Sequence, residues 1–304
     1  MTIAITGGTG FVGQAVLDLV ARRGIAARAL ARKVPDDRPG VDWIEGNLGD
    51  SGALDRLVTG ADAVIHIAGL TNTPDPAEFE AANVTGTAAM LDAAKRAELK
   101  RFIFVSSLSA REPQLSAYGA SKARAEELVA ASGLDWTMVR PPAVYGPRDS
   151  DMFELFKSAR YGLVPMPPSG ATSMIHVDDL AKLLLALAPS SPKLRHEKFE
   201  PDDGREGGWS YKELGQAIGD AMGRRVFAPN LPKSLLRSAA GLDKIVRGKN
   251  AKLTADRVGY MCHPNWVVRS DKAVPSDIWA PSIGTREGLK QTAAWYRQQG
   301  WLVT

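Results

Sequence analysis

Two kinds of hydrophobic pattern alternate along the first 190 residues. Short apolar runs such as Ile3–Ile5 are typical of buried strands, whereas longer segments such as Phe11–Arg23 repeat apolar residues every three or four positions, as an amphipathic helix does. Strands are predicted at 3–5, 27–30, 41–44, 63–67, 102–105 and 136–139, and helices at 11–23, 53–58, 77–97 and 117–131. This alternation predicts an α/β fold with a doubly wound parallel sheet and helices on both of its faces.

The pattern changes after Gly146. Residues 148–172 are rich in Pro, Gly and Ser, residues 174–188 return to strand followed by helix, and from about residue 191 the predicted helices are shorter. We therefore expect a larger sheet domain and a smaller α/β lobe that covers a ligand cleft. The first is predicted to comprise residues 1–150 plus 173–190, and the second residues 151–172 plus 191–304.

One predicted helix of the smaller lobe is strongly amphipathic. Its apolar residues share one helical face, with the basic residues largely away from that face. We expect the apolar face to pack on the core and the basic side to face solvent, with contact to a membrane surface or a partner as the alternative. The apolar residues are Leu235, Leu236, Ala239, Leu242, Ile245 and Val246, and the basic ones are Arg237, Lys244 and Arg247.

A glycine-rich turn joins the first strand to the first helix, with the sequence Thr-Gly-Gly-Thr-Gly-Phe-Val-Gly over residues 6–13. Gly7 permits a tight turn, Gly10 lets the backbone approach a pyrophosphate, and Gly13 lets the helix pack on the sheet. Free N–H groups at the start of the helix then hold the anion. The turn therefore predicts a Rossmann dinucleotide site at Gly7, Thr9, Gly10, Phe11, Val12 and Gly13.

The end of the second strand distinguishes between the two nicotinamide dinucleotides. A carboxylate there binds the ribose 2′-hydroxyl of NAD, but this sequence has Ala31-Arg32-Lys33 and no carboxylate before Asp36. A guanidinium pairs with the 2′-phosphate of NADP through two parallel hydrogen bonds. We therefore expect Arg32 to make NADP(H) the favoured cofactor over NAD(H), with a solvated Arg32 as the alternative.

Only one of the six tyrosines, Tyr118, has a lysine four residues later, Lys122. On a helix that spacing places both side chains on one face, and a nearby ammonium lowers the pKa of a phenol. Tyr118 is then suited to act as general acid or base toward a carbonyl or alcohol. Ser107, just after the predicted strand 102–105, is expected to hydrogen-bond the same substrate oxygen, with Ser109 as a less favoured substitute.

Composition narrows the classes of function. The formal charge of +4 comes with no aromatic-rich basic stripe, which argues against nucleic acid, and no apolar run approaches the ~18 residues that span a bilayer. The four histidines lie far apart without metal-ligand spacing, so we expect no metal. A single cysteine, Cys262, excludes a disulfide within the chain and, with no signal peptide at the start, favours a cytoplasmic location.

The ordered motifs together resemble the extended short-chain dehydrogenase/reductase superfamily, the NAD-dependent epimerase/dehydratase family. The resemblance covers nearly the whole chain. Besides the glycine turn, it is carried by Gly46–Asp50, His66–Gly69, Asn83–Thr87, Ser106-Ser107, Tyr118–Lys122, Arg140–Pro147, Ile175–Asp179, Glu287–Leu289 and Trp295-Tyr296.

The resemblance implies roles for individual residues. Tyr118 would be the acid/base, Lys122 would also hold the nicotinamide ribose, and Ser107 would orient the substrate. Asn47, which stands where the family usually has aspartate, and Leu48 would lie beside the adenine. Ala68 and Gly69 would back the pyrophosphate and ribose, Asn83 would support the site or simply bond to helix backbone, and a homodimer would form through residues 77–97 and 117–131.

Two departures bear on the substrate. Members that act on sugar nucleotides typically have asparagine where this chain has Ala143, and arginine where it has Thr172-Ser173, so two usual partners of a diphosphate are absent, with Arg148 or Arg160 as alternative partners. We therefore expect an NADP(H)-dependent oxidoreductase for a small-molecule carbonyl/alcohol pair. The alternatives are a nucleotide-sugar epimerase or dehydratase, and a non-catalytic cofactor-sensing or assembly protein. Candidate substrate contacts are Tyr145, Arg148 and Met174.

Overall fold

Seven parallel strands form the central sheet of the computed structural model, which describes residues 1–302. Their order is β10-β6-β5-β4-β1-β2-β3, so the chain winds outward from β1 and then returns to β4 on the other side of β1. Ligands bind where the winding reverses in this way. The strands are β1 (Thr2–Thr6), β2 (Ala26–Ala31), β3 (Val41–Glu45), β4 (Ala63–His66), β5 (Arg101–Val105), β6 (Asp135–Val139) and β10 (Glu197–Phe199).

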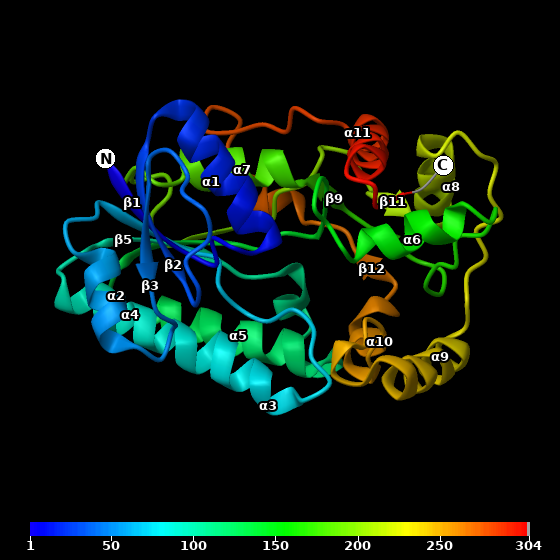
Figure 1. Cartoon of the computed structure of the whole chain (residues 1–304), viewed down its shortest axis with the longest axis horizontal. Coiled ribbons are helices and arrows are strands. Elements are labelled where there is room, and N and C mark those ends of the chain that lie inside the picture. Colours follow the sequence, from blue (N-terminus) through cyan, green and yellow to red (C-terminus); the bar gives the residue numbers. More distant parts are fainter. Residues whose placement is uncertain (303–304) are drawn as a thin grey trace.

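Helices cover both faces of the sheet, because successive strand residues point to opposite sides (Figure 1). Ile3 and Ile5 pack with α1 (Phe11–Arg23) and α7 (Val177–Ala186) on one face. Ala4 packs on the other face, in the layer that α2 (Ser51–Val58), α4 (Gly86–Arg96) and α5 (Ala117–Ala130) complete. The predicted doubly wound parallel fold is confirmed.

The helix predicted over 77–97 is divided into three parts. A short α3 (Pro76–Phe79) leads into the π-helical turn Glu80–Thr85, and α4 continues from Gly86. Such turns insert an extra residue into a helix and are frequent at functional sites. Here the turn carries Asn83, whose side-chain amide donates to the carbonyl of Leu70 at 3.0 Å and to the Ser121 hydroxyl at 2.9 Å.

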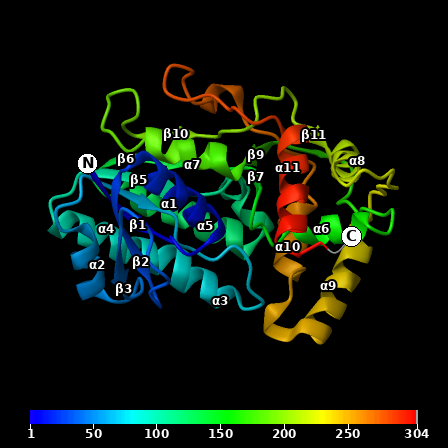
Figure 2. The same ribbon diagram turned by 45° about the horizontal axis from the view of Figure 1, so that its top comes forward.

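The smaller lobe lies beyond the carboxyl ends of the strands (Figure 2). Its core contains Phe156, Trp209 and Tyr296. Its helices are α6 (Met152–Ala159), α8 (Tyr211–Ala221), α9 (Lys233–Arg247), α10 (Ala255–Met261) and α11 (Thr285–Gln298), and its short strands are β7 (Ala143–Tyr145), β8 (Ala171–Thr172), β9 (Met174–His176), β11 (Trp209–Ser210) and β12 (Asn265–Trp266).

Two expectations about this lobe need correction. Strand β10 pairs with β6 at the edge of the central sheet, although every residue after 190 was expected in the smaller lobe. Helix α9 does form, but only Leu236 and Ala240 of its residues are buried, so most of its apolar face does not pack on the core. Among residues 1–302, no helix is both long enough and apolar enough to span a membrane.

Candidate active site

The glycine turn after β1 has the backbone shape that the sequence requires. Gly7 has φ +74°, and a Cβ there would lie 2.7 Å from the backbone nitrogen of Ala68. A Cβ at Gly13 would clash with the carbonyl oxygen of Gly7, to which the N–H of Gly10 donates at 3.0 Å. Only glycine permits this approach of α1 to the end of β1.

The N-terminus of α1 is available to an anion. No side chain of residues 1–302 caps it, and no acidic residue lies in its first turn. Unpaired N–H groups and the positive end of the helix dipole therefore face the turn, as a dinucleotide pyrophosphate needs. Thr9 lies in this turn, and Phe11 and Val12 are the first residues of α1. Phe11 and Val12 also line the neighbouring cavity. The residues present thus fit a dinucleotide.

The other expected cofactor residues follow the carboxyl ends of β2, β3 and β4. Arg32 is exposed directly after β2, and Asn47 accepts a hydrogen bond from the N–H of Gly49 at 2.8 Å. Leu48 lies against Gly86 at the start of α4. Ala68 donates its N–H to the Thr6 hydroxyl at 3.2 Å, and Gly69 lies beside Asn83 and Lys122.

Tyr118 and Lys122 lie on the same buried face of α5 and both line one cavity. The Lys122 ammonium donates to the carbonyl oxygen of Val105 at the end of β5, at 2.8 Å. Burial lowers the pKa of Lys122 to about 8, with Glu126 acting in the opposite direction. Gly69 and Ser107, which follow the carboxyl ends of β4 and β5, thus line the same cavity as Tyr118.

The pKa of Tyr118 differs from the expected direction. Burial raises it to about 12, and hydrogen bonds from the hydroxyls of Ser107 and Ser109 only partly offset this. The expectation of a lowered pKa was wrong because desolvation of the phenolate outweighs the effects of the two serines and of Arg257. The phenol is therefore protonated at neutral pH and able to donate a proton.

Both serines, and not Ser107 alone, belong to this group. The hydroxyl of Ser109 donates to the Ser107 oxygen at 2.9 Å, both serines line the cavity with Tyr118, and both act to lower its pKa. Ser107 follows β5 as the residue that starts a short 3₁₀ turn, which returns Ser109 to the same side. Three residues with hydroxyl groups therefore line one part of the cavity.

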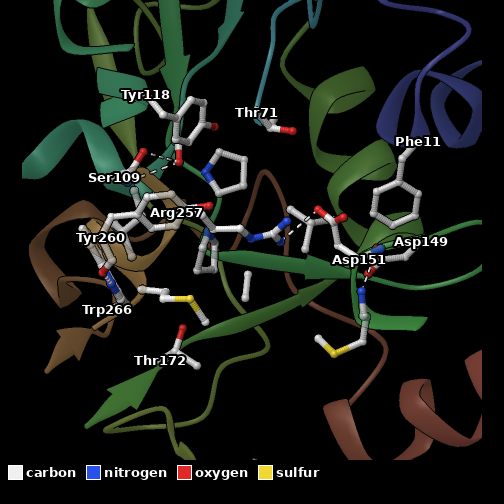
Figure 3. A pocket seen from close by; sticks show the side chains of 18 of the residues that line it. Phe11, Thr71, Ser109, Tyr118, Asp149, Asp151, Thr172, Arg257, Tyr260 and Trp266 are labelled. Atoms are coloured by element: carbon white, nitrogen blue, oxygen red, sulfur yellow. Dashed lines mark hydrogen bonds and ion pairs between the residues drawn. The ribbon is translucent and has the colours of Figure 1, made fainter. Parts of the chain in front are cut away.

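The cavity in front of these hydroxyls has a volume of about 460 Å³. Figure 3 shows Tyr118 and Ser109 with Tyr260 and Arg257 on one side of it and Phe11 on the other. Away from the hydroxyls the wall is mainly apolar, as is usual for a site that takes a small organic molecule. The apolar lining includes Val12, Leu155, Pro165, Met166, Leu214, Met261 and Trp266.

Helix α10 contributes residues that the sequence patterns did not indicate. The Asp256 carboxylate accepts hydrogen bonds from the backbone N–H groups of Ala117 at 2.6 Å and Tyr118 at 3.3 Å. The ring of Tyr260 lies 5.9 Å from that of Tyr118. These contacts join positions almost 140 residues apart, and no local spacing signals them.

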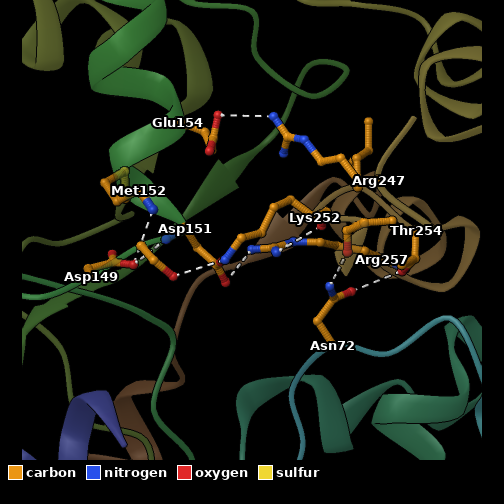
Figure 4. A network of polar contacts seen from close by, with 12 residues as sticks. Asn72, Asp149, Asp151, Met152, Glu154, Arg247, Lys252, Thr254 and Arg257 are labelled. Carbon is orange, nitrogen blue, oxygen red and sulfur yellow. Dashed lines mark hydrogen bonds and ion pairs between the residues drawn. The ribbon is translucent and has the colours of Figure 1, made fainter. Parts of the chain in front are cut away.

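A charged network forms another part of the cavity wall (Figure 4). The guanidinium of Arg257 donates to Asp151 at 2.9 Å, and Lys252 lies 3.7 Å from the same carboxylate. Burial raises the pKa of the neighbouring Asp149 to about 7. Asn72 donates to the carbonyl of Ala251, which ties the loop after β4 to this part of the smaller lobe.

The three expected substrate contacts lie elsewhere. Tyr145 and Met174 are fully buried in the core of the smaller lobe and do not line this cavity. Arg148 donates to the Asp18 carboxylate of α1 at 2.7 Å. Ala143 and Val144 of β7 do line the cavity, whereas Tyr145 of β7 and Met174 of β9 pack in the core of the smaller lobe. No cluster of three metal-binding side chains occurs within residues 1–302.

Comparison with known proteins identifies the family. Residues 3–198 match the model of the NAD dependent epimerase/dehydratase family, so the chain belongs to this family. It is 35% identical to "Ceramide reductase" of Caulobacter vibrioides (strain NA1000 / CB15N), over 99% of this chain and 96% of that protein. The chain is therefore an NAD(P)-dependent enzyme of the oxidoreductase/epimerase type.

Two further likenesses extend this result. A ketoreductase of Stigmatella aurantiaca, named for a 4-hydroxy-2-methyl-3-oxo-4-farnesyl-3,4-dihydroquinoline-1-oxide, is 30% identical over 63% of this chain and 66% of its own. The solved structure titled "MoeE5 in complex with UDP-glucuronic acid and NAD" superposes with a TM-score of 0.76 at 22% identity, covering 98% of this chain and 99% of that one. The latter likeness shows the fold.

Proposed function

We propose that this enzyme is an NADPH-dependent reductase of a ketone that carries a long apolar group. The observation that supports it most is the cavity, in which the hydroxyls of Tyr118, Ser107 and Ser109 meet at one side of a mainly apolar wall. Two relatives are named as reductases, one for ceramide and one for a farnesyl-bearing compound. A substrate with its carbonyl at the hydroxyls and its apolar chain along the wall would match both the polar and the apolar part of the cavity.

The proposed chemistry divides between cofactor and protein. NADPH, when bound, would supply the hydride to the carbonyl carbon and would be oxidised to NADP⁺. Tyr118 donates its proton to the carbonyl oxygen, so that an alcohol forms, and Ser107 and Ser109 hydrogen-bond that oxygen. Lys122, fixed by the carbonyl of Val105, would hold the ribose hydroxyls and favour the phenolate that remains.

A nucleotide sugar fits this cavity less well. The cavity wall has Ala143 and Thr172 where the family's sugar-nucleotide members carry diphosphate partners, and Arg257 is paired with Asp151. An epimerase or dehydratase would also regenerate its cofactor in each cycle. Net consumption of NADPH therefore separates the proposed reductase from that alternative.

The test is NADPH oxidation with ketones of increasing alkyl chain length, and with UDP-glucose for comparison. We expect kcat/KM to rise with chain length and kcat to fall by about 100-fold or more in Tyr118→Phe, because a positioned general acid contributes that much. Tyr161→Phe, on the surface, is the matched control. Absence of net oxidation with every ketone, or full activity in Tyr118→Phe, would exclude the proposal, and the latter would favour a sensor.

We also propose that the enzyme is cytoplasmic and forms a homodimer through residues 77–97 and 117–131. Helices α4 and α5 pack against each other on one face of the sheet, so a second copy could meet both at once. Glu substitutions at exposed positions of that face would then convert a dimer to a monomer in sedimentation.

A further inference from the structure

Helix α9 presents a line of large apolar side chains to solvent. Leu235, Leu242, Ile245 and Val246 are 50%, 64%, 81% and 80% exposed. Their spacing of seven, three and one residues places all four on one side of the helix. We name these four residues the α9 apolar line.

The other sides of α9 carry a buried contact with α10 and exposed basic side chains. Leu236 and Ala240 pack against Val258 of α10 and hold the helix to the lobe. Arg237 and Lys244, seven residues apart, lie on the side away from the apolar line. Within residues 1–302, the ion pairs of α9 involve Arg247 with Asp243 and Glu154, and neither of those two basic side chains.

Positive charge is concentrated in this part of the chain. Residues 223–257 contain nine Lys or Arg and two Asp or Glu, whereas the whole chain has a formal charge of only +4. The remainder of the protein is thus net negative. Arg247, Lys252 and Arg257 pair with Glu154 or Asp151, which lie outside this range, so the other six Lys and Arg carry the excess charge. A helix with an apolar side, a basic side and further basic residues around it has the composition of one that lies in a membrane interface.

The position of α9 connects this surface to the cavity. Helix α10 packs directly behind α9, and Arg257, Tyr260 and Met261 of α10 line the cavity. Packed helix axes are about 10 Å apart, so only one helix layer separates the α9 surface from the cavity. Both views show the two helices together at the edge of the molecule, away from the central sheet (Figures 1 and 2).

We propose that α9 docks the protein on an anionic lipid surface, with the α9 apolar line in the headgroup region and the net positive charge around the helix attracting the anionic lipids. A second copy of the chain is a poorer occupant. A two-fold dimer would bring the same surface of each copy together, and with it two concentrations of positive charge. A lipid surface offers apolar and anionic contacts together.

The proposal rests on this surface and not on the proposed reaction, so it is tested without substrate or cofactor. The full chain is mixed with vesicles of equal parts phosphatidylglycerol and phosphatidylcholine, or of phosphatidylcholine alone, and sedimented at low salt. We expect binding to the anionic vesicles and a loss of about tenfold or more in Ile245→Ser/Val246→Ser. Arg237→Gln/Lys244→Gln should cause a smaller loss, of about threefold, because these charges lie on the far side of the helix and act on the lipid only at long range. Added salt should weaken the binding.

Tyr161→Ser is the matched control, since Tyr161 is the most exposed large hydrophobic residue outside α9, at 85%. It should bind as the unmodified protein does. Because all the altered side chains are largely exposed, unchanged thermal unfolding confirms that each variant is folded. Absence of vesicle binding, equal loss in Tyr161→Ser, or a dimer that the α9 substitutions abolish without any vesicle binding would overturn the proposal.

Discussion

Arg32 is the residue on which the choice between the two dinucleotides depends. It stands exposed directly after β2, where a bound cofactor would present its ribose. Arg32→Glu should weaken NADPH by about 100-fold, since a charge-assisted pair is lost and repulsion is gained, while NADH changes by only about threefold or less. The measurement is fluorescence titration with each dinucleotide.

A charge control accompanies this titration. Arg22→Glu makes the same change of charge at an exposed position near the far end of α1. It should leave the ratio of NADPH to NADH affinity unaltered. Equal weakening of both dinucleotides by Arg32→Glu would mean that Arg32 does not bind the 2′-phosphate.

At the scale of elements, α10 positions α5. The Asp256 carboxylate holds two backbone N–H groups in the first turn of the helix that carries Tyr118. In Asp256→Ala these groups lose their acceptor, and loss of such a cap costs about 1 kcal/mol. We expect kcat to fall by about tenfold while NADPH affinity is retained, because a small displacement of a reacting group reduces the rate strongly.

The control for this substitution removes another cap. Asp75 accepts a hydrogen bond from the N–H of Ala77 at the start of α3, so Asp75→Ala should lower stability without lowering kcat. Asp256→Asn keeps one acceptor oxygen and should recover part of the rate. If Asp256→Ala and Asp75→Ala lower kcat equally, Asp256 has no special part in positioning Tyr118.

Elements with a local signal were predictable from the sequence, and contacts between distant elements were not. The glycine turn and the Tyr118–Lys122 spacing each lie within one short segment, so the pattern and the geometry coincide. Asp256 and Tyr260 reach Tyr118 only because α10 packs on α5. The periodicity of α9 predicted a helix but could not tell which of its sides a neighbour covers.

At the scale of the whole molecule, the doubly wound sheet was predictable and the place of its last strand was not. The sheet follows from the alternation of strands and helices along the chain. β10 was missed because three residues at a sheet edge carry too short a pattern. Tyr145 and Met174 were misplaced because a strand that follows the sheet domain can point its side chains either into a cleft or into a core.

The stability of the whole chain should depend on pH through Asp149. Burial raises the pKa of this carboxyl from 3.8 to about 7, so the folded state favours its neutral form. Its contribution is fully present below pH 3.8 and is lost as the pH rises through about 7. Between those values, unfolding free energy should fall by about 1.4 kcal/mol per pH unit relative to Asp149→Asn, which cannot ionise.

The comparison with Asp149→Asn removes the contribution of other groups. Burial lowers the pKa of His66 to about 3, and this acts with the opposite sign, since stability is lost as the pH falls below 6.5. Because His66 is present in both proteins, its effect cancels in the difference between their urea unfolding curves. If the unfolding free energies of the two proteins changed with pH in parallel, Asp149 would be ionised in the folded protein. Water in the cavity or the positive charge of Arg257 would then stabilise its carboxylate.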